Sequence, residues 1–166
     1  MFKVNLKNLL VNSAIVLIIF LVDRLSKIYI LKVAELENKV DIYISEYLNL
    51  YLIWNKGIAF GLLSFEENLL YNLISLIIFI ISLVIVGMIV KSSGFRKYVL
   101  IIILGGALSN LFDRVYYSAV PDFIDFHINN YHWFIFNVAD IFITIGVLCL
   151  ILVELISNKS LDNEKK

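Results

Sequence analysis

Long apolar segments dominate this chain and constrain its fold more than any other feature. The clearest of them, residues 69–90, carries no charged side chain and has the ~20 residues that a helix needs to cross a bilayer. Three further segments approach this length, at residues 9–31, 98–114 and 133–156. Hydrophobic residues make up 61% of the sequence, against roughly half in a soluble domain. We therefore predict an all-α integral membrane protein with four transmembrane helices.

A different pattern lies between the first two apolar segments. Over residues 39–53 apolar side chains alternate imperfectly with others, and Tyr and Ile are frequent, which is typical of short strands. Asn129 and Asn130 indicate a turn before the last helix. We expect a small β-sheet and loop outside the membrane. No repeat, linker or low-complexity segment divides the chain, so residues 1–166 are predicted to form a single domain.

Lysine and arginine side chains are distributed unequally between the two ends of the expected helices. One end carries Lys3, Lys7, Lys91, Arg96, Lys97, Lys159, Lys165 and Lys166, and the other carries Lys32, Lys39 and Lys56. Because cytoplasmic loops carry the excess of positive charge, both termini should be cytoplasmic. This orientation brings the polar residues of the helices to one level near the outer face: Asp23, Lys27, Asn110, Asp113, Arg114, Asn137 and Asp140.

Asp140 is the ionisable residue that most strongly suggests a functional site. It follows Trp133 by about seven residues, which places it roughly 10 Å below the interface at ~1.5 Å per residue. Charged groups within a span are costly when they face lipid, so they usually face a cavity and mark function. Asn137 lies on the same helix face. The alternative is a purely structural buried carboxylate, just as Asp23 and Lys27 could be an ion pair that anchors the first helix.

A second carboxylate must come from elsewhere in the chain. Asp113, Asp122 and Asp125 are all candidates, and the sequence pattern does not choose between them. Pro121 favours a loop that presents Asp122, since proline removes a backbone donor and keeps the preceding residue extended. Asp113 and Arg114 could instead form a structural pair.

Two neighbouring carboxylates cannot both ionise comfortably, so they can share a proton and act as base and acid in peptide hydrolysis by water. Other chemistries are poorly supported. His127 and His132 lack the HExxH spacing and are interpreted as interfacial side chains, GxSxG is absent, and Cys149 has no acid–base partner nearby. We expect no metal, no cofactor and, because the net charge is zero, no nucleic acid partner. A carrier or channel subunit with a proton or ion site at Asp140 is the rival interpretation, although carriers favour midplane sites and repeats.

Five ordered motifs resemble those of the lipoprotein signal peptidases, also called signal peptidase II. They are Asp23-Arg-Leu-Ser-Lys27, Asn55-Lys-Gly-Ile-Ala-Phe60, Gly105-Gly-Ala-Leu-Ser-Asn110 with Asp113-Arg114, Val120-Pro-Asp-Phe123 and Phe136-Asn-Val-Ala-Asp140. The resemblance implies a four-helix aspartyl protease of the bacterial inner membrane, with its active site near the periplasmic face. Such an enzyme cuts the signal peptide from a prolipoprotein just before the diacylglyceryl-modified cysteine.

The resemblance also implies roles for individual residues. Asp122 and Asp140 match the catalytic pair, and the other matching positions support the pair or bind substrate: Asn110, Arg114, Asn137, Asn55, Gly57, Asp23 and Lys27. The segment between the first two helices would cover the lipid-bearing substrate. No metal and no covalent acyl-enzyme are implied.

The chain departs from the family pattern at a few positions, none of which removes a functional group. Ser109 and Ser118 stand where the family usually has Gly, Ile58 where it usually has Ala, and Pro121 where a β-branched residue is common. Ile58 and Ser109 are expected to narrow the groove that holds the substrate.

Overall fold

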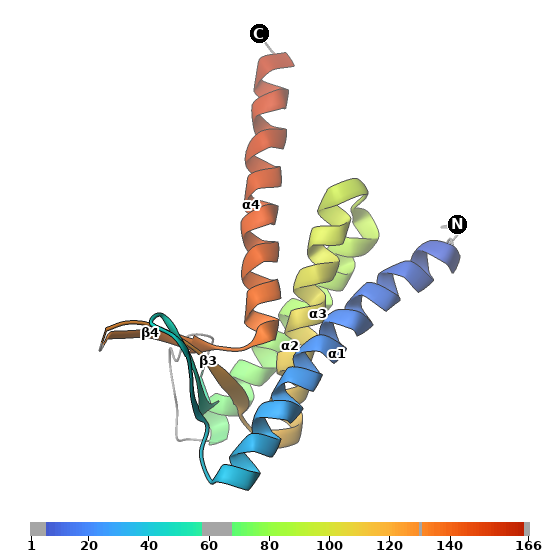
Figure 1. Ribbon diagram of the computed structural model, residues 1–166. Helices are drawn as coiled ribbons and strands as arrows, with labels where there is room; N and C mark the ends of the chain where they lie inside the picture. The colour runs from blue at the N-terminus through green and yellow to red at the C-terminus, as the bar shows by residue number, and fades with distance from the viewer. Residues whose placement is uncertain (1–5, 58–67, 130, 165–166) are drawn as a thin grey trace.

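The computed structural model describes residues 6–57, 68–129 and 131–164, which form four helices and a four-stranded antiparallel sheet (Figure 1). The helices are α1 (Leu6–Glu37), α2 (Asn68–Lys91), α3 (Gly94–Tyr117) and α4 (Val138–Glu164). The strands are β1 (Asp41–Ser45), β2 (Leu48–Asn55), β3 (Val120–Ile128) and β4 (Tyr131–Phe136). The N-terminal end of α1, the C-terminal end of α4 and the turn between α2 and α3 point to the same side of the molecule. The sheet lies toward the other side (Figure 1).

Three of the helices are long and apolar enough to cross a membrane: residues Tyr71–Lys91, Gly94–Tyr117 and Val138–Ile156. They correspond to α2, α3 and α4, and many of their large apolar side chains are exposed, as expected where lipid replaces water. Helix α1 is not among them, and its apolar sequence contains Asp23, Arg24 and Lys27. The prediction of a small sheet is confirmed, whereas the prediction that α1 also spans remains a prediction.

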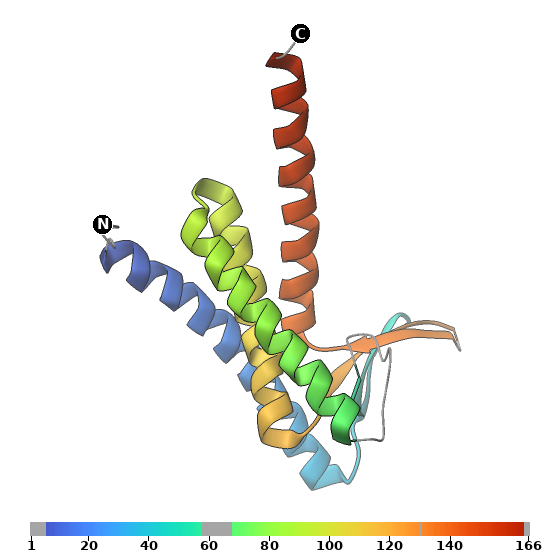
Figure 2. The same cartoon turned by 180° about the vertical axis from the view of Figure 1, so that it is seen from behind.

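Helix α3 lies at the centre of the molecule and packs against α1, α2 and α4 (Figures 1 and 2). Two adjacent glycines permit this packing. A Cβ added at Gly105 would lie 3.0 Å from the side chain of Ile19 on α1, and one at Gly106 would lie 2.7 Å from the carbonyl oxygen of Ala139 on α4. The distance at Gly106 is one that real Cβ atoms essentially never show, and the distance at Gly105 is tighter than nine in ten real contacts, so the Gly-Gly pair allows two helices to pack against α3 at one level.

The sheet has the order β1-β2-β3-β4, with all neighbouring strands antiparallel. The strands expected over residues 39–53 correspond to β1 and β2. Ile30 on α1 packs with Val40, which directly precedes β1, and with Phe123 on β3. This contact holds β3 against the last turns of α1. This contact fixes the position of the β3 residue Asp122 relative to the helices.

Two expectations about the last third of the chain are wrong. The fourth helix was expected to begin at Trp133, but Trp133 belongs to β4 and α4 begins at Val138. The apolar and aromatic residues of β4 pair with β3, as Phe134 does with Phe126, and composition alone does not distinguish such a strand from the start of an apolar helix. Pro121 favours a loop by its sequence, yet it lies in β3, at the end where β3 pairs with β2 but not with β4. A missing backbone donor is tolerated there.

The chain leaves α3 through a residue in the left-handed region. Ser118 has φ 56° and ψ 22° and ends the helix, which is the conformation that glycine adopts most readily. Glycine would adopt this conformation without the steric cost that a Cβ brings at Ser118. The following residues, Ala119 and Val120, are buried and lead directly into β3.

Candidate active site

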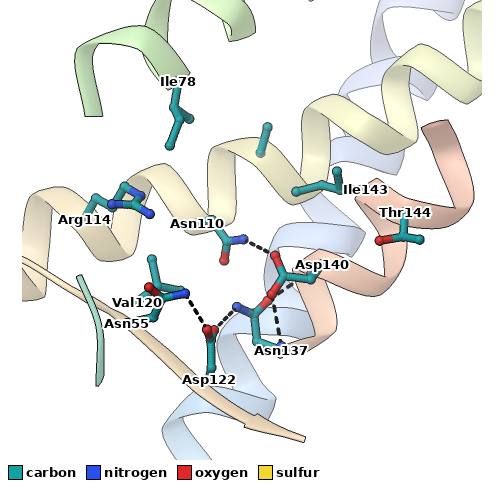
Figure 3. Close-up of a pocket in the computed structure, with 11 residues that line it drawn as sticks. Asn55, Ile78, Asn110, Arg114, Val120, Asp122, Asn137, Asp140, Ile143 and Thr144 are labelled. Atoms are coloured by element: carbon teal, nitrogen blue, oxygen red, sulfur yellow. Dashed lines mark hydrogen bonds between the residues drawn. The ribbon is translucent and has the colours of Figure 1, made fainter. Parts of the chain in front are cut away.

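A cavity of about 170 Å³ lies where α3, the start of α4 and the ends of β2 and β3 meet (Figure 3). It is lined by Asn55, Ile78, Ala107, Asn110, Arg114, Val120, Asp122, Asn137, Asp140, Ile143 and Thr144. Apolar side chains from α2, α3 and α4 form one part of the wall, and carboxylates, amides and a guanidinium form the other. A cavity of this kind suits an extended chain that must be held by polar groups within an apolar surround.

Asp140 is held by the structure that begins α4. The backbone N–H of Asp140 donates to Asn137 Oδ1 at 3.1 Å, and the backbone N–H of Asn137 donates to Asp140 Oδ2 at 3.2 Å. This reciprocal pair is a capping box, which satisfies two backbone donors that the first turn leaves free. It also places a carboxylate in the first turn, where the helix dipole favours negative charge. Helix capping therefore fixes the position of Asp140 before any contact with substrate.

Asn137 also connects Asp140 to Asp122. Its Nδ2 donates to Asp122 Oδ1 at 2.6 Å, and the second oxygen of Asp122 accepts from Asn55 Nδ2 at 2.9 Å (Figure 3). Asn110 Nδ2 donates to Asp140 Oδ1 at 2.9 Å. Two carboxylates from different parts of the chain are thus bridged by a single asparagine at the wall of one cavity.

The pKa of Asp122 is raised from 3.8 to about 7. Burial is the main cause, since the side chain is 1% exposed, and the negative charge of Asp140 adds to it. Hydrogen bonds from Asn55 and Asn137 act in the opposite direction but do not cancel the effect. Near neutral pH the Asp122 carboxyl therefore binds and releases a proton readily, as a group in acid–base catalysis must.

A network of buried ion pairs lies behind the cavity. Lys27 Nζ lies 2.7 Å from Asp23 Oδ2 and 2.6 Å from Asp113 Oδ2, and Arg24 forms a further ion pair with Asp113. Lys27 also donates to Asn110 Oδ1 at 2.9 Å. This contact fixes which way the Asn110 amide faces, so its NH₂ group is directed at Asp140.

Asp23 connects the same network to α4. Its Oδ1 accepts from the backbone N–H of Ala139 at 2.8 Å, and its Oδ2 accepts from Ser109 Oγ at 2.6 Å. Ser109 is fully buried and does not line the cavity, so the expectation that it narrows the substrate groove is wrong for the part of the chain that the structure describes. It is a partner of Asp23 instead. Ile58 lies outside the described residues.

Arg114 forms the opposite wall. One of its terminal nitrogens donates to the carbonyl oxygen of Gly57, and its guanidinium lies 5.5 Å from the ring centroid of Tyr71. Gly57 in turn donates its backbone N–H to Asn55 Oδ1 at 2.8 Å. Arg114 Nε and Nη1 make no hydrogen bond within residues 6–57, 68–129 and 131–164, although the side chain is only 5% exposed. These N–H groups are available to an acceptor in the cavity.

The structure brings together most of the site residues that the sequence indicates. Asn55, Asn110, Arg114, Asp122, Asn137 and Asp140 line the cavity, whereas Asp23 and Lys27 lie behind it and Gly57 takes part through its backbone. The ion pair between Asp23 and Lys27 is confirmed. The suggested pair of Asp113 with Arg114 is wrong, because Asp113 contacts Arg24 and Lys27.

Sequence reasoning missed the apolar and small residues of the cavity wall. Thr144 follows Asp140 by one helical turn, and Ala107 precedes Asn110 by nearly one, so helical periodicity could have found both. Ile78 comes from α2 and carries no such signal, since it lies within the uninterrupted apolar run 76–81.

The chain is similar to known proteins over most of its length. The family model described as Signal peptidase (SPase) II matches residues 15–156. A lipoprotein signal peptidase of Pelagibacter ubique is 55% identical over 163 residues, which is 98% of each chain. One from Anaplasma phagocytophilum is 41% identical over 145 residues, covering 87% of this chain and 92% of the relative.

The fold is also similar to those of solved bacterial membrane enzymes. A bacterial membrane enzyme determined by the in meso method at 2.3 Å resolution has a TM-score of 0.68 with 28% identity, over 90% of both chains. A second, determined by the same method at 1.9 Å resolution, has a TM-score of 0.65 with 29% identity, over 87% of this chain and 92% of that one.

Proposed function

The chain belongs to the signal peptidase II family, and from that membership we propose that Asp122 and Asp140 are its catalytic pair. It is an aspartic peptidase with lipoprotein signal peptidase activity, which cleaves the signal peptides of prolipoproteins. One observation supports this pairing above the others: Asn137 donates hydrogen bonds to both carboxylates at the wall of a single cavity. The other candidate partners of Asp140, Asp113 and Asp125, have partners of their own outside that cavity.

The proposed reaction uses one ionised and one protonated carboxyl group. We assign the ionised state to Asp140, which lies in the first turn of α4 and accepts hydrogen bonds from Asn110 and from the backbone of Asn137. It takes a proton from water while the water oxygen attacks the scissile carbonyl carbon. Asp122 carries the single proton of the pair at the start. It donates a hydrogen bond to the oxyanion that forms and then protonates the leaving amine. The pair ends with its proton on Asp140, and exchange with solvent restores the starting state.

The remaining polar groups of the wall position the substrate in this proposal. Arg114 Nε and Nη1 supply N–H donors for a substrate carbonyl, and the apolar surround strengthens such hydrogen bonds. Lys27 acts through Asn110, whose amide it orients toward Asp140, and is therefore a positioning residue. No metal ion and no covalent intermediate take part in these steps.

Helix α1 is proposed as a fourth transmembrane helix. The charged side chains within its apolar segment are turned inward, since Asp23 and Lys27 are fully buried and Arg24 is 8% exposed. Apolar side chains form its exposed surface: Leu9, Leu10, Val11, Leu17, Ile18, Leu21, Val22, Leu25 and Ile28. A helix of this kind presents an apolar surface to lipid although its sequence contains charges. With lysines concentrated near both termini and near the turn between α2 and α3, the proposed orientation has both termini in the cytoplasm and the cavity near the periplasmic face of the inner membrane.

The proposed substrate is a prolipoprotein that carries a diacylglyceryl group on the cysteine after the cleavage site. The cavity lies at the end of apolar helices, so a substrate anchored by acyl chains would bring its scissile bond to this level. A gel-shift assay with purified protein and matched lipidated and unlipidated precursors tests the proposal. We expect cleavage of the lipidated precursor only. Equal cleavage of both precursors would contradict the lipid requirement, and cleavage of neither would contradict the assigned substrate.

A further inference from the structure

The β3–β4 hairpin carries a cluster of metal-ligating side chains that does not line the catalytic cavity. Asp125 and His127 lie on β3 and His132 lies on β4, where it is the register partner of His127. One potential ligand atom from each residue lies within 4.8 Å of the others. His132 Nδ1 is 2.8 Å from Asp125 Oδ2, and His127 Nδ1 is 3.7 Å from the same oxygen. The strand register therefore brings the imidazoles of His127 and His132 close to the carboxylate of Asp125.

His127 provides an independent sign that this cluster lacks a ligand. The side chain is 8% exposed, and its Nδ1 atom makes no hydrogen bond within residues 6–57, 68–129 and 131–164. A buried polar atom left without a partner costs free energy, so such atoms in native structures usually face a bound water or ion. The neighbouring Asp125 is 1% exposed, and a buried carboxylate is usually paired with a cation. Within this cluster Asp125 has the His132 imidazole as its partner, while the Nδ1 atom of His127 faces the same carboxylate without a hydrogen bond.

We propose that Asp125, His127 and His132 bind a divalent transition-metal ion, with Zn²⁺ the best match. Two imidazoles and one carboxylate are a ligand set that zinc accepts, while Ca²⁺ and Mg²⁺ prefer oxygen ligands. Ligand atoms of a tetrahedral zinc site lie ~3.3 Å apart, from bond lengths of about 2.0–2.1 Å. The observed separations of 2.8 and 3.7 Å lie on either side of that value. Because the side chain of His132 is 57% exposed, a water molecule has access to the fourth position.

The metal would join β3 to β4 near the tip of the hairpin. Asp122 lies on the same strand, at the end that β4 does not pair with, so the hairpin is part of the support of the catalytic strand. The bound ion takes no part in peptide hydrolysis, because none of its ligands lines the catalytic cavity. Its effect is on the stability of the sheet, since an ion that binds only the folded chain stabilises it.

Zinc binding to the purified full-length protein, prepared in detergent without a polyhistidine tag, tests this inference. Equilibrium dialysis followed by metal analysis should find one Zn²⁺ per chain, unaffected by excess Ca²⁺, and zinc should raise the thermal unfolding midpoint. His132→Ala removes an exposed ligand with little risk to folding, and it should weaken zinc binding at least tenfold and abolish the rise in the midpoint. Asp41→Asn, an exposed carboxylate on β1 that pairs with Lys39, is the matched control and should bind zinc like the wild type.

Two results would overturn the proposal. One is that the wild type takes up no zinc at micromolar free concentration, which would leave the cluster as hydrogen-bonded side chains only. The other is that His132→Ala binds zinc as tightly as Asp41→Asn does. Replacing zinc with Co²⁺ adds a direct reading, since its visible spectrum reports the ligand geometry and should lose intensity in His132→Ala. These measurements need no substrate, so their failure is distinct from a failure of the proposed catalytic pair.

Discussion

Two groups of buried carboxylates lie on either side of Asn110, and they differ in their partners. Asp23 and Asp113 contact the ammonium group of Lys27, and all three side chains are fully buried. Asp122 and Asp140 accept hydrogen bonds from amides and line a cavity. The first group forms buried ion pairs, whereas burial and the neighbouring Asp140 raise the pKa of Asp122 in the second group to about 7. The same residue type is therefore structural in one group and suited to acid–base catalysis in the other.

Removing either proposed catalytic carboxylate should have the largest effect on cleavage. Asn is nearly isosteric with Asp but cannot take up the proton, so Asp122→Asn and Asp140→Asn should each lower kcat/KM by at least ~1,000-fold. The protein should still accumulate, since the cavity keeps its shape. The double variant should be no worse than the weaker single variant, because residues that act as a unit are not additive. The measurement is gel-shift cleavage of a lipidated precursor.

One result for Asp113 would contradict the distinction between the two groups of carboxylates. If Asp122→Asn kept near-wild-type turnover while Asp113→Asn lost it per folded molecule, the catalytic pair would have been assigned to the wrong group. A loss of folded protein in Asp113→Asn alone would not do so, because that is the effect expected of the ionic network.

The ionic network should respond with a loss of stability instead. Lys27→Met leaves Asp23 and Asp113 buried without their shared cation, and breaking a buried ion pair in this way costs about 3–5 kcal/mol. We expect a lower free energy of unfolding in detergent and a smaller yield of folded protein. Cleavage per folded molecule should fall by less than in the catalytic variants, since Lys27 hydrogen-bonds to Asn110, which in turn donates to Asp140. A Lys27→Met variant with wild-type stability would contradict the structural role of the network.

Packing of α3 against α4 can be tested separately from charge. In Gly106→Ala the new Cβ would lie 2.7 Å from the carbonyl oxygen of Ala139, a backbone atom beside the first turn of α4. Overpacking of this kind costs about 1–3 kcal/mol and should also displace Asp140. Gly87→Ala is the matched control, because a Cβ there meets nothing within 4 Å and alanine favours a helix. Thermal unfolding of the two variants should show a loss for Gly106→Ala only.

The sequence allowed part of this arrangement to be predicted, and the part it missed has a physical reason. Asn137 and Asp140 are one helical turn apart, so their shared face could be predicted from spacing alone. The partner of Asp140 could not, since Asp122 comes from another element and its position depends on how β3 pairs with β2. The chain order of the motifs identified it only through a resemblance to a family.

Residues that meet through strand register were missed for the same reason. His127 and His132 look like unrelated interfacial side chains until β3 and β4 are paired, and the sequence of β4 itself predicts the start of a helix. Long-range ion pairs behave similarly, because nothing local indicates that Asp113 pairs with Arg24 rather than with its neighbour Arg114. Local rules find helix caps and faces, whereas contacts between distant elements require the fold.

The pH dependence of cleavage should show the smallest effect and the most specific one. The proposed acid, Asp122, has its pKa raised from 3.8 to about 7, so its proton is lost as the pH rises through about 7. We expect kcat/KM to fall up to tenfold for each pH unit above that value. The same shift contributes stability that is fully present below pH ~3.8 and is lost as the pH rises toward about 7, because the folded state binds the proton more tightly than the unfolded chain.

A variant of Asn55 sharpens this last prediction. The hydrogen bond from Asn55 favours the charged form of Asp122 and so lowers its pKa, against the effects of burial and of Asp140. Asn55→Leu removes that donor, so the alkaline limb of the pH profile should move to higher pH even if the maximal rate falls. A merely structural Asn55 would lower the rate without moving the limb. A limb that moved to lower pH would show that Asp122 is not the group that must hold the proton, and the roles of acid and base proposed for Asp122 and Asp140 would have to be exchanged.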